Sequence, residues 1–191
     1  MASFGEPPRD CRGFPASVIT PGRSLYRIHR AEHAPWWFKG DRLGRFNLDP
    51  PRGTCCLSFT AAGTFVEVFG HIGRVAQSDI DARRLATLKL PGEMRLADCT
   101  SARAAGFGAT AAIHRSDDYN LTHRWAGSWH NAGFDGVKYF CGYDPSQHET
   151  AVAIFGDAGL AAWPADPSAV IPESLLDEVE ATYGIKVLPT P

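Results

Sequence analysis

Apolar positions recur along the chain in short runs that are bounded by glycine, proline and aspartate. Short apolar runs between such turn-forming residues are typical of β-strands. The pattern predicts strands over residues 25–28, 55–59, 85–90, 94–99, 137–140 and 151–155. Pro91 and Gly92 lie between the third and fourth of these runs and predict a hairpin turn.

A second pattern, with apolar residues three and four positions apart, predicts three helices. The first follows Thr60, a good N-cap, and the second covers residues 121–132 and stops at Gly133. The third spans residues 173–183, with a proline before it and a glycine after it. The first helix is expected to bury one stripe of side chains, namely Phe65, Val68, Phe69 and Ile72.

The predicted helices are scattered between the strands and do not alternate with them, which is typical of an α+β chain. Residues 1–22 carry prolines, glycines and mixed charge without periodicity, so we expect an N-terminal tail. Residues 23–191 are expected to form a single domain that includes the helix over 173–183. The chain of 191 residues has no internal repeat.

Composition narrows the class of protein. The formal net charge of −2 argues against a general nucleic-acid binder, which is usually strongly basic. No apolar run has the length of a membrane span, and the start of the chain lacks a signal-peptide core. Five cysteines without paired spacing indicate reduced thiols and a cytoplasmic protein. Among the seven histidines only His29 and His33 lie as close as four positions apart, and no metal site is expected.

The stretch "LYRIHRAEHAPWWFKGDRLGRFNL", residues 25–48, combines cations with adjacent aromatic side chains. Arg27 lies inside a predicted strand, where its planar fork would suit a carboxylate or phosphate. Arg45 could add a second fork beside Trp36 and Trp37. The alternative is that these residues are a piece of core whose arginines are half-exposed and salt-bridged.

Three further residues are weaker candidates when each is taken alone. Glu67 faces away from the apolar stripe of its helix, which usually means a solvated carboxylate. Cys56 and Cys141 fall in predicted strands, where cysteine behaves as a small buried hydrophobe. A site on the second face of the first helix would make Glu67 functional.

The order of these motifs carries more information than any one of them. "LYRIHR" is followed by "GRFNLDPPRGTCCLSFTAAGTFVEVF" and then by "GFDGVKYFCGYDPSQHETAVAIF". This order resembles the RES-domain family over about residues 24–160. By position, Arg27 matches the family's arginine and Glu67 its glutamate. Cys141 stands where the family has serine, and Cys56 stands where it often has tyrosine.

The resemblance implies a compact α+β domain with a mostly antiparallel, ADP-ribosyltransferase-like sheet and a cleft for NAD⁺. Family enzymes break the nicotinamide–ribose bond and pass the ADP-ribosyl group to phosphate or water. NAD⁺ is then a substrate, and no prosthetic group or metal is implied. The family also includes toxins of bacterial toxin–antitoxin pairs, so an antitoxin protein is an expected partner.

The resemblance implies catalytic roles for Arg27, Glu67 and Cys141. The dinucleotide would contact Arg27 and Arg45, the side chains of Trp36 and Trp37, and the position of Cys56. Two alternatives stay open: an ADP-ribosyltransferase that modifies an unknown acceptor, and a nucleotide-binding module that has lost turnover. An altered pocket that selects another substrate is also compatible with the two cysteine replacements.

Overall fold

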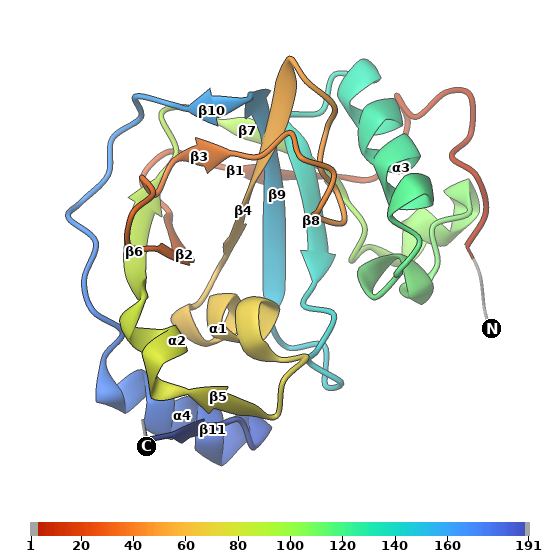
Figure 1. The fold of residues 1–191 in the computed structure, drawn as a ribbon. Helices are drawn as coiled ribbons and strands as arrows, with labels where there is room; N and C mark the ends of the chain where they lie inside the picture. Colours follow the sequence, from red (N-terminus) through yellow and green to blue (C-terminus); the bar gives the residue numbers. More distant parts are fainter. Residues whose placement is uncertain (1–3, 190–191) are drawn as a thin grey trace.

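The computed structural model describes residues 4–189 as a curved seven-stranded sheet with helices packed at its lower end and along one side (Figure 1). The strand order is β1-β7-β8-β9-β4-β2-β6. Neighbouring strands are antiparallel except for β7 and β8, which are parallel. The expected α+β class with a mostly antiparallel sheet is therefore confirmed.

All six predicted strands are present, and they correspond to β2, β4, β6, β7, β8 and β9. The strands of the large sheet are β1 (Ala16–Ile19), β2 (Ser24–Arg30), β4 (Arg52–Ser58), β6 (Arg83–Lys89), β7 (Met94–Asp98), β8 (Gly136–Phe140) and β9 (Thr150–Asp157). Two small pairs lie beside it: β3 (Trp37–Phe38) with β10 (Gly159–Leu160), and β5 (Arg74–Ala76) with β11 (Lys186–Leu188).

The three predicted helices are α1 (Ala61–Phe69), α3 (Tyr119–Asn131) and α4 (Glu173–Tyr183). The sequence pattern did not reveal α2 (Gln77–Asp81) or the 3₁₀ turns η1 (Ala102–Phe107) and η2 (Ala111–His114). The side chain of Thr60 caps α1 by accepting a hydrogen bond from the Gly63 N–H at 2.8 Å.

The expected apolar stripe of α1 was partly wrong. Phe65 and Phe69 are buried, as expected, but Val68 is half-buried and lines a pocket. Ile72 lies beyond the end of the helix and is 41% exposed. Val66 takes part in the core instead, because the helix rests on the sheet through the face centred between Phe65 and Val66.

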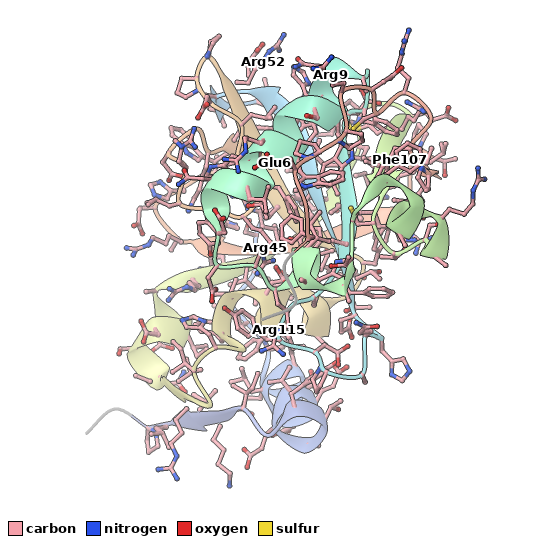
Figure 2. The ribbon with its side chains drawn as sticks, turned by 90° about the vertical axis from the view of Figure 1, so that its right-hand side faces the viewer. Glu6, Arg9, Arg45, Arg52, Phe107 and Arg115 are labelled. Atoms are coloured by element: carbon pink, nitrogen blue, oxygen red, sulfur yellow. The ribbon has the colours of Figure 1, made fainter. Side chains whose placement is uncertain are left out.

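The expected N-terminal tail is part of the domain. β1 pairs with β7 at the edge of the sheet, and Phe14 is 2% exposed among the aromatic rings of α3. Its ring centroid lies 5.4 Å from that of Trp129. Glu6 forms an ion pair with Arg124 of α3 at 2.6 Å, and Figure 2 shows Glu6 alongside that helix. The ring of Phe14 contacts four aromatic rings in all, and this packing holds the N-terminal segment on the domain although its composition is that of a tail.

The expected hairpin at Pro91 and Gly92 is also wrong. β6 and β7 are not neighbours, since β6 pairs with β2 and β7 pairs with β1 and β8. The strongly curved sheet brings both strand ends to one apolar cluster, where Leu90 and Leu96 are buried and Met94 packs against them. The apolar residues on either side of the turn are thus buried in a shared core, although the two strands do not pair with each other.

His114 is one of three buried histidines in the described part of the chain. His114 ends η2 and is 5% exposed, and its Nδ1 accepts a hydrogen bond from the Phe140 N–H at 3.4 Å. Burial lowers the pKa of His114 from 6.5 to about 4, and the positive charge of Arg45 acts in the same direction. The ring is therefore neutral at pH 7.

Replacing Phe14 tests whether the N-terminal segment belongs to the fold. Phe14→Ala should lower the free energy of unfolding by about 3–5 kcal/mol, because it empties a closely packed aromatic site. The control is Val18→Ala on β1, where the side chain is 52% exposed and the loss should stay within about 1 kcal/mol. Urea denaturation of both variants measures this, and equal losses would contradict the packing of Phe14.

The low pKa of His114 predicts a pH dependence of stability. The unfolded chain binds this proton near pH 6.5 and the folded chain only near pH 4, so the contribution of His114 is complete above pH 6.5 and lost as the pH falls toward 4. Between pH 7 and 4.5 the wild type should lose about 2 kcal/mol more than His114→Gln. His148→Gln, at an exposed position, should follow the wild type. Parallel denaturation curves for the wild type and His114→Gln would contradict this assignment.

Candidate functional site

A pocket of about 450 Å³ opens between α1, β4, β8 and the loop over residues 39–47. Its size falls within the range of small-molecule sites. Among the described residues that line it, Glu67 alone carries a carboxylate, whereas Arg27, Lys39 and Arg45 carry positive charge. The pocket therefore favours an anionic ligand, although the chain as a whole has a net charge of −2.

The pocket exists because two adjacent strands diverge. β2 and β4 share a single paired position, Tyr26 with Ser58. Beyond it, the Ile28 N–H donates to the hydroxyl of Thr64 on α1 at 3.0 Å instead of to a neighbouring strand. Thr64 is buried and also lines the pocket, so the helix itself holds the sheet open at this point.

Arg27 bridges the opened edge. Its Nη1 donates to the carbonyl oxygens of Pro35 and, at 3.1 Å, of Trp37, and it lies 2.9 Å from the Cys55 sulfur. Nε and Nη2 form no hydrogen bond within residues 4–189. One end of the guanidinium therefore fixes the neighbouring segment, and the other end can bind an anion at the pocket.

Glu67 points into the pocket from the face of α1 that does not rest on the core. Its Oε1 accepts a hydrogen bond from the Gly142 N–H at 2.9 Å, and its Oε2 accepts one from the Tyr139 hydroxyl at 3.1 Å. Burial, and then the charge of Glu67, raise the pKa of Tyr139 well above its ordinary value, so its hydroxyl stays a donor. The carboxylate is thus held in one orientation.

Cys141 does not face the pocket. Its side chain is 1% exposed, and its sulfur points at the Gly63 carbonyl oxygen at 3.7 Å. Burial raises the pKa of the Cys141 thiol, and the charges of Glu67 and Glu149 raise it further. A buried neutral thiol is a poor nucleophile, so the expected catalytic role of this side chain finds no geometric support.

The turn after β8 contributes a backbone group instead. Gly142 supplies the N–H that holds Glu67. A Cβ at this position would lie 2.5 Å from the His114 carbonyl oxygen, which no side chain could tolerate without a backbone shift. The local backbone therefore restricts position 142 to glycine.

Arg45 lines the pocket next to Tyr139, with its guanidinium carbon 6.0 Å from the centre of the Tyr139 ring. Its Nε is buried and has no hydrogen-bond partner among the described residues. A buried donor without a partner is costly, and an anionic ligand would satisfy it.

The two tryptophans expected beside the ligand lie elsewhere. Trp36 is 1% exposed in the core on the opposite face of the sheet, where its Nε1 donates to the Pro164 carbonyl oxygen at 2.9 Å. Trp37 is 39% exposed and stacks on His33 with ring centres 5.8 Å apart. Neither side chain lines the pocket, because this segment meets Arg27 through backbone carbonyls and turns its rings away.

Cys56 does line the pocket, whereas its neighbour Cys55 is buried on the other face, as strand alternation requires. Cys56 lies exposed at the bottom of a recess that protein surrounds. Desolvation there raises the pKa of its thiol, and Arg27 partly offsets the rise. The side chain is therefore a small neutral group on the pocket floor.

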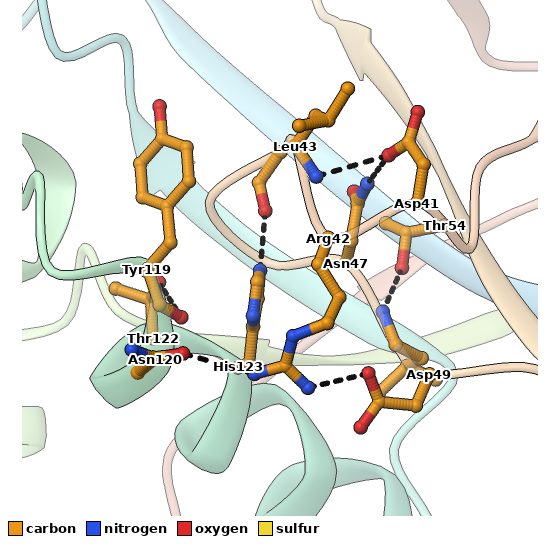
Figure 3. Close-up of polar contacts among 12 residues, drawn as sticks. Asp41, Arg42, Leu43, Asn47, Asp49, Thr54, Tyr119, Asn120, Thr122 and His123 are labelled. Carbon is orange, nitrogen blue, oxygen red and sulfur yellow. Dashed lines mark hydrogen bonds and ion pairs between the residues drawn. The ribbon is translucent and has the colours of Figure 1, made fainter.

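One wall of the pocket is anchored to α3 (Figure 3). Arg42 pairs with Asp49 at 2.6 Å and also donates to the Asn120 side chain at 3.2 Å. The ring of His123 contacts the Gly44 carbonyl oxygen at 2.7 Å through Nε2. These contacts tie the loop to one helix at Arg42 and Gly44, so Arg45 is presented from a fixed wall.

Sequence reasoning missed the two groups that position Glu67. Tyr139 lies in a strand whose other residues are apolar or basic, and a buried hydroxyl at such a place was the available signal. The Gly142 N–H left no signal, because any residue except proline carries that donor.

Two further observations bear on the chemistry. Within residues 4–189, no three side chains of the His, Cys, Asp and Glu types gather closely enough to hold a metal ion. In the same range, no helix combines the length and the apolar character needed to cross a bilayer.

Comparisons with known proteins agree with the fold and the order of motifs. Curated proteins give no match. A chain in the crystal structure of the M. tuberculosis MbcT–MbcA toxin–antitoxin complex is similar, with a TM-score of 0.65 and 18% identity over 86% of this chain and 92% of that chain. At that identity the likeness shows a shared fold. The model of the RES domain matches residues 24–172, which is most of the sequence, and the chain therefore belongs to the RES domain family.

Proposed function

We propose that this protein cleaves NAD⁺ between nicotinamide and ribose, as an NAD⁺ phosphorylase or glycohydrolase. The observation that carries the proposal is the meeting of Arg27 and Glu67 at one cationic pocket in a RES-domain chain. NAD⁺ is the substrate in this proposal, and phosphate or water accepts the ADP-ribosyl group.

Glu67 would act on the ribose. The bond between C1 of the ribose and the nicotinamide nitrogen breaks with its electron pair passing to the ring, which leaves as neutral nicotinamide. Positive charge then develops on the ribose, and a carboxylate stabilises such an oxocarbenium-like centre. The hydrogen bonds from Tyr139 and Gly142 fix the carboxylate before the reaction, so little reorganisation is needed when the charge appears.

The rest of the reaction needs an acceptor and an anion site. A phosphate or water oxygen attacks C1, and the proton of the acceptor passes to solvent. The free end of the Arg27 fork and the unpartnered Nε of Arg45 are donors for the phosphates of the dinucleotide. Cys56 leaves room on the pocket floor where a larger side chain would intrude.

We also propose an antitoxin protein as a partner of this chain. The proposal rests on the toxin–antitoxin complex that contains the similar fold. At the pocket, Leu43 is 75% exposed, and a partner that covers the opening would bury it. Expression without a partner should then slow growth and lower cellular NAD⁺, and unchanged growth and NAD⁺ would count against the toxin.

Purified protein incubated with NAD⁺, with and without phosphate, tests the reaction. Nicotinamide should be released in either case. The second product should be ADP-ribose if water is the acceptor and a phosphorylated ADP-ribose if phosphate is the acceptor. Transfer of the ADP-ribosyl group to another acceptor would favour an ADP-ribosyltransferase. NAD⁺ that binds and is recovered intact would favour a binding module, and no binding and no release would reject both.

Glu67→Gln tests the role of the carboxylate, because it removes the negative charge and keeps the size of the side chain. Turnover should fall by about a hundredfold or more, because an electrostatic stabiliser is removed at the site of developing charge. Stability should change by about 1 kcal/mol or less, since glutamine still offers an oxygen to the Gly142 N–H and the Tyr139 hydroxyl can accept from the new amide.

The matched control is Glu178→Gln, an exposed glutamate on α4 that should leave turnover unchanged. Nicotinamide release and melting temperature are measured on both variants. Wild-type turnover in Glu67→Gln would show that the carboxylate is not at the reacting centre.

A further inference from the structure

The connection between β8 and β9, residues 141–149, lies against α1 (Figure 1). At the end of the helix, a Cβ on Gly70 would lie 2.5 Å from the Cβ of Tyr143. At the start of the helix, the Thr60 hydroxyl donates a hydrogen bond to the Glu149 carboxylate. The connection therefore contacts both ends of the helix that carries the pocket carboxylate.

A β-turn at the start of this connection directs the Gly142 N–H toward Glu67. The Asp144 N–H donates to the Cys141 carbonyl oxygen at 3.1 Å, which closes a turn with Gly142 as its second residue. Such a turn does not use the N–H of its second residue, and here that group donates to Oε1 of Glu67 at 2.9 Å. The orientation of Glu67 therefore depends on the shape of this turn.

Asp144 fixes the end of the turn with a buried carboxylate, since the residue is 3% exposed. Its Oδ1 accepts hydrogen bonds from the Ser146 N–H at 2.9 Å and from the Ser146 hydroxyl at 2.5 Å, and its Oδ2 accepts one from the Glu149 N–H at 2.8 Å. Within residues 4–189 it forms no ion pair, so hydrogen bonds compensate the burial of its charge. Burial by itself would raise the pKa of Asp144, but the hydrogen bonds from Glu149 and Ser146 outweigh it and lower this pKa below its ordinary value. The group is therefore ionised at pH 7.

An asparagine at position 144 would fill nearly the same volume without replacing the carboxylate. Both oxygens of Asp144 accept hydrogen bonds, whereas the side chain of asparagine carries a donor at one of the two positions. That donor would face the N–H of Ser146 or of Glu149. Residues 145–148 are exposed, so little packing holds this part of the connection once the contacts of Asp144 are lost.

We propose that Asp144 is a positioning residue: it fixes the turn over residues 141–144, and the Gly142 N–H in that turn holds Glu67 in the orientation needed for turnover. Asp144 does not line the pocket, so its effect on the substrate passes through Glu67. The inference rests on the proposed function, because the orientation of Glu67 matters for turnover only if this carboxylate acts on the ribose.

Hydrogen exchange of backbone amides, measured by NMR on the isotope-labelled protein, tests the link between Asp144 and Gly142 without any substrate. In Asp144→Asn the Gly142 amide should exchange about tenfold faster than in the wild type, because the turn opens more often. The Ala153 amide lies in β9 between two paired strands, reports on unfolding of the whole domain and should change less. The matched control is Asp166→Asn, at an exposed aspartate without an ion pair in the described part of the chain, which should exchange like the wild type.

Ser146→Ala is a milder variant of the same test. Ser146 is exposed, and the substitution removes only the hydrogen bond from its hydroxyl to Asp144, so the protein should fold normally. The Gly142 amide should exchange about threefold faster, again with a smaller change at Ala153. This variant decides the outcome if Asp144→Asn does not fold.

Steady-state kinetics with NAD⁺ then test the positioning role, at a temperature at which every variant is folded. Asp144→Asn should lower kcat about tenfold and change KM by about twofold or less, because a misdirected carboxylate loses transition-state stabilisation more than substrate binding. Ser146→Ala should lower kcat by about threefold, and Asp166→Asn should leave both constants unchanged. A residue that only stabilises the fold would lower the melting temperature and leave the kcat of the folded protein as it is.

Two results would overturn the proposal. One is Gly142 exchange that rises no more than Ala153 exchange in both Asp144→Asn and Ser146→Ala, and the other is an unchanged kcat in a variant whose Gly142 amide exchanges faster. Failure of the proposed function looks different. Gly142 exchange that depends on Asp144, in a wild-type protein that releases no nicotinamide from NAD⁺, would reject NAD⁺ cleavage and leave Asp144 as the residue that keeps Glu67 in place.

Discussion

The structure depends on how the backbone groups at the gap between β2 and β4 are hydrogen-bonded. A strand that leaves its neighbour exposes backbone groups, and each buried group without a partner costs about 1–3 kcal/mol. Here the Ile28 N–H is satisfied by Thr64, and Arg27 satisfies the carbonyls of Pro35 and Trp37. Thr64 thus takes the place of a missing ladder partner of β2, and Arg27 ties the segment over residues 35–37 to the same strand. The sheet can therefore remain open as a pocket without the penalty of unpaired polar groups.

The helix that provides Thr64 at the gap also carries the carboxylate, and helical geometry explains how. Thr64, Val66 and Glu67 lie within one turn of α1 but project in different directions, because successive residues are rotated by about 100°. Thr64 meets the strand, Val66 enters the core and Glu67 enters the pocket. The face of Glu67 could be separated from the core face by periodicity alone. Its partners Tyr139 and Gly142 could not, since they lie more than seventy positions away in the sequence.

What the sequence predicted well was local. Six strands and three helices follow from runs and caps that each extend over a few residues. The errors share a long-range cause. Phe14 belongs to the core because α3 supplies rings to receive it, and β6 and β7 are separated because the curved sheet offers both ends one apolar cluster. Trp36 was misplaced for the same reason: adjacency to cations did not reveal that its segment turns the ring toward Trp163.

Net charge was the least informative property of this chain for its site. Acidic residues elsewhere in the chain offset the positive charge of the pocket, where Arg27, Lys39 and Arg45 lie together with one carboxylate. The net charge therefore gives no sign of it. Such an arrangement costs stability while the pocket is empty, because the cations repel one another in a partly desolvated recess. A bound anion replaces this repulsion between cations with attraction, and the change contributes to the free energy of binding. Because Arg27 is already bonded at the sheet edge and the loop that carries Arg45 is anchored on α3, little of that gain is lost to ordering side chains on binding.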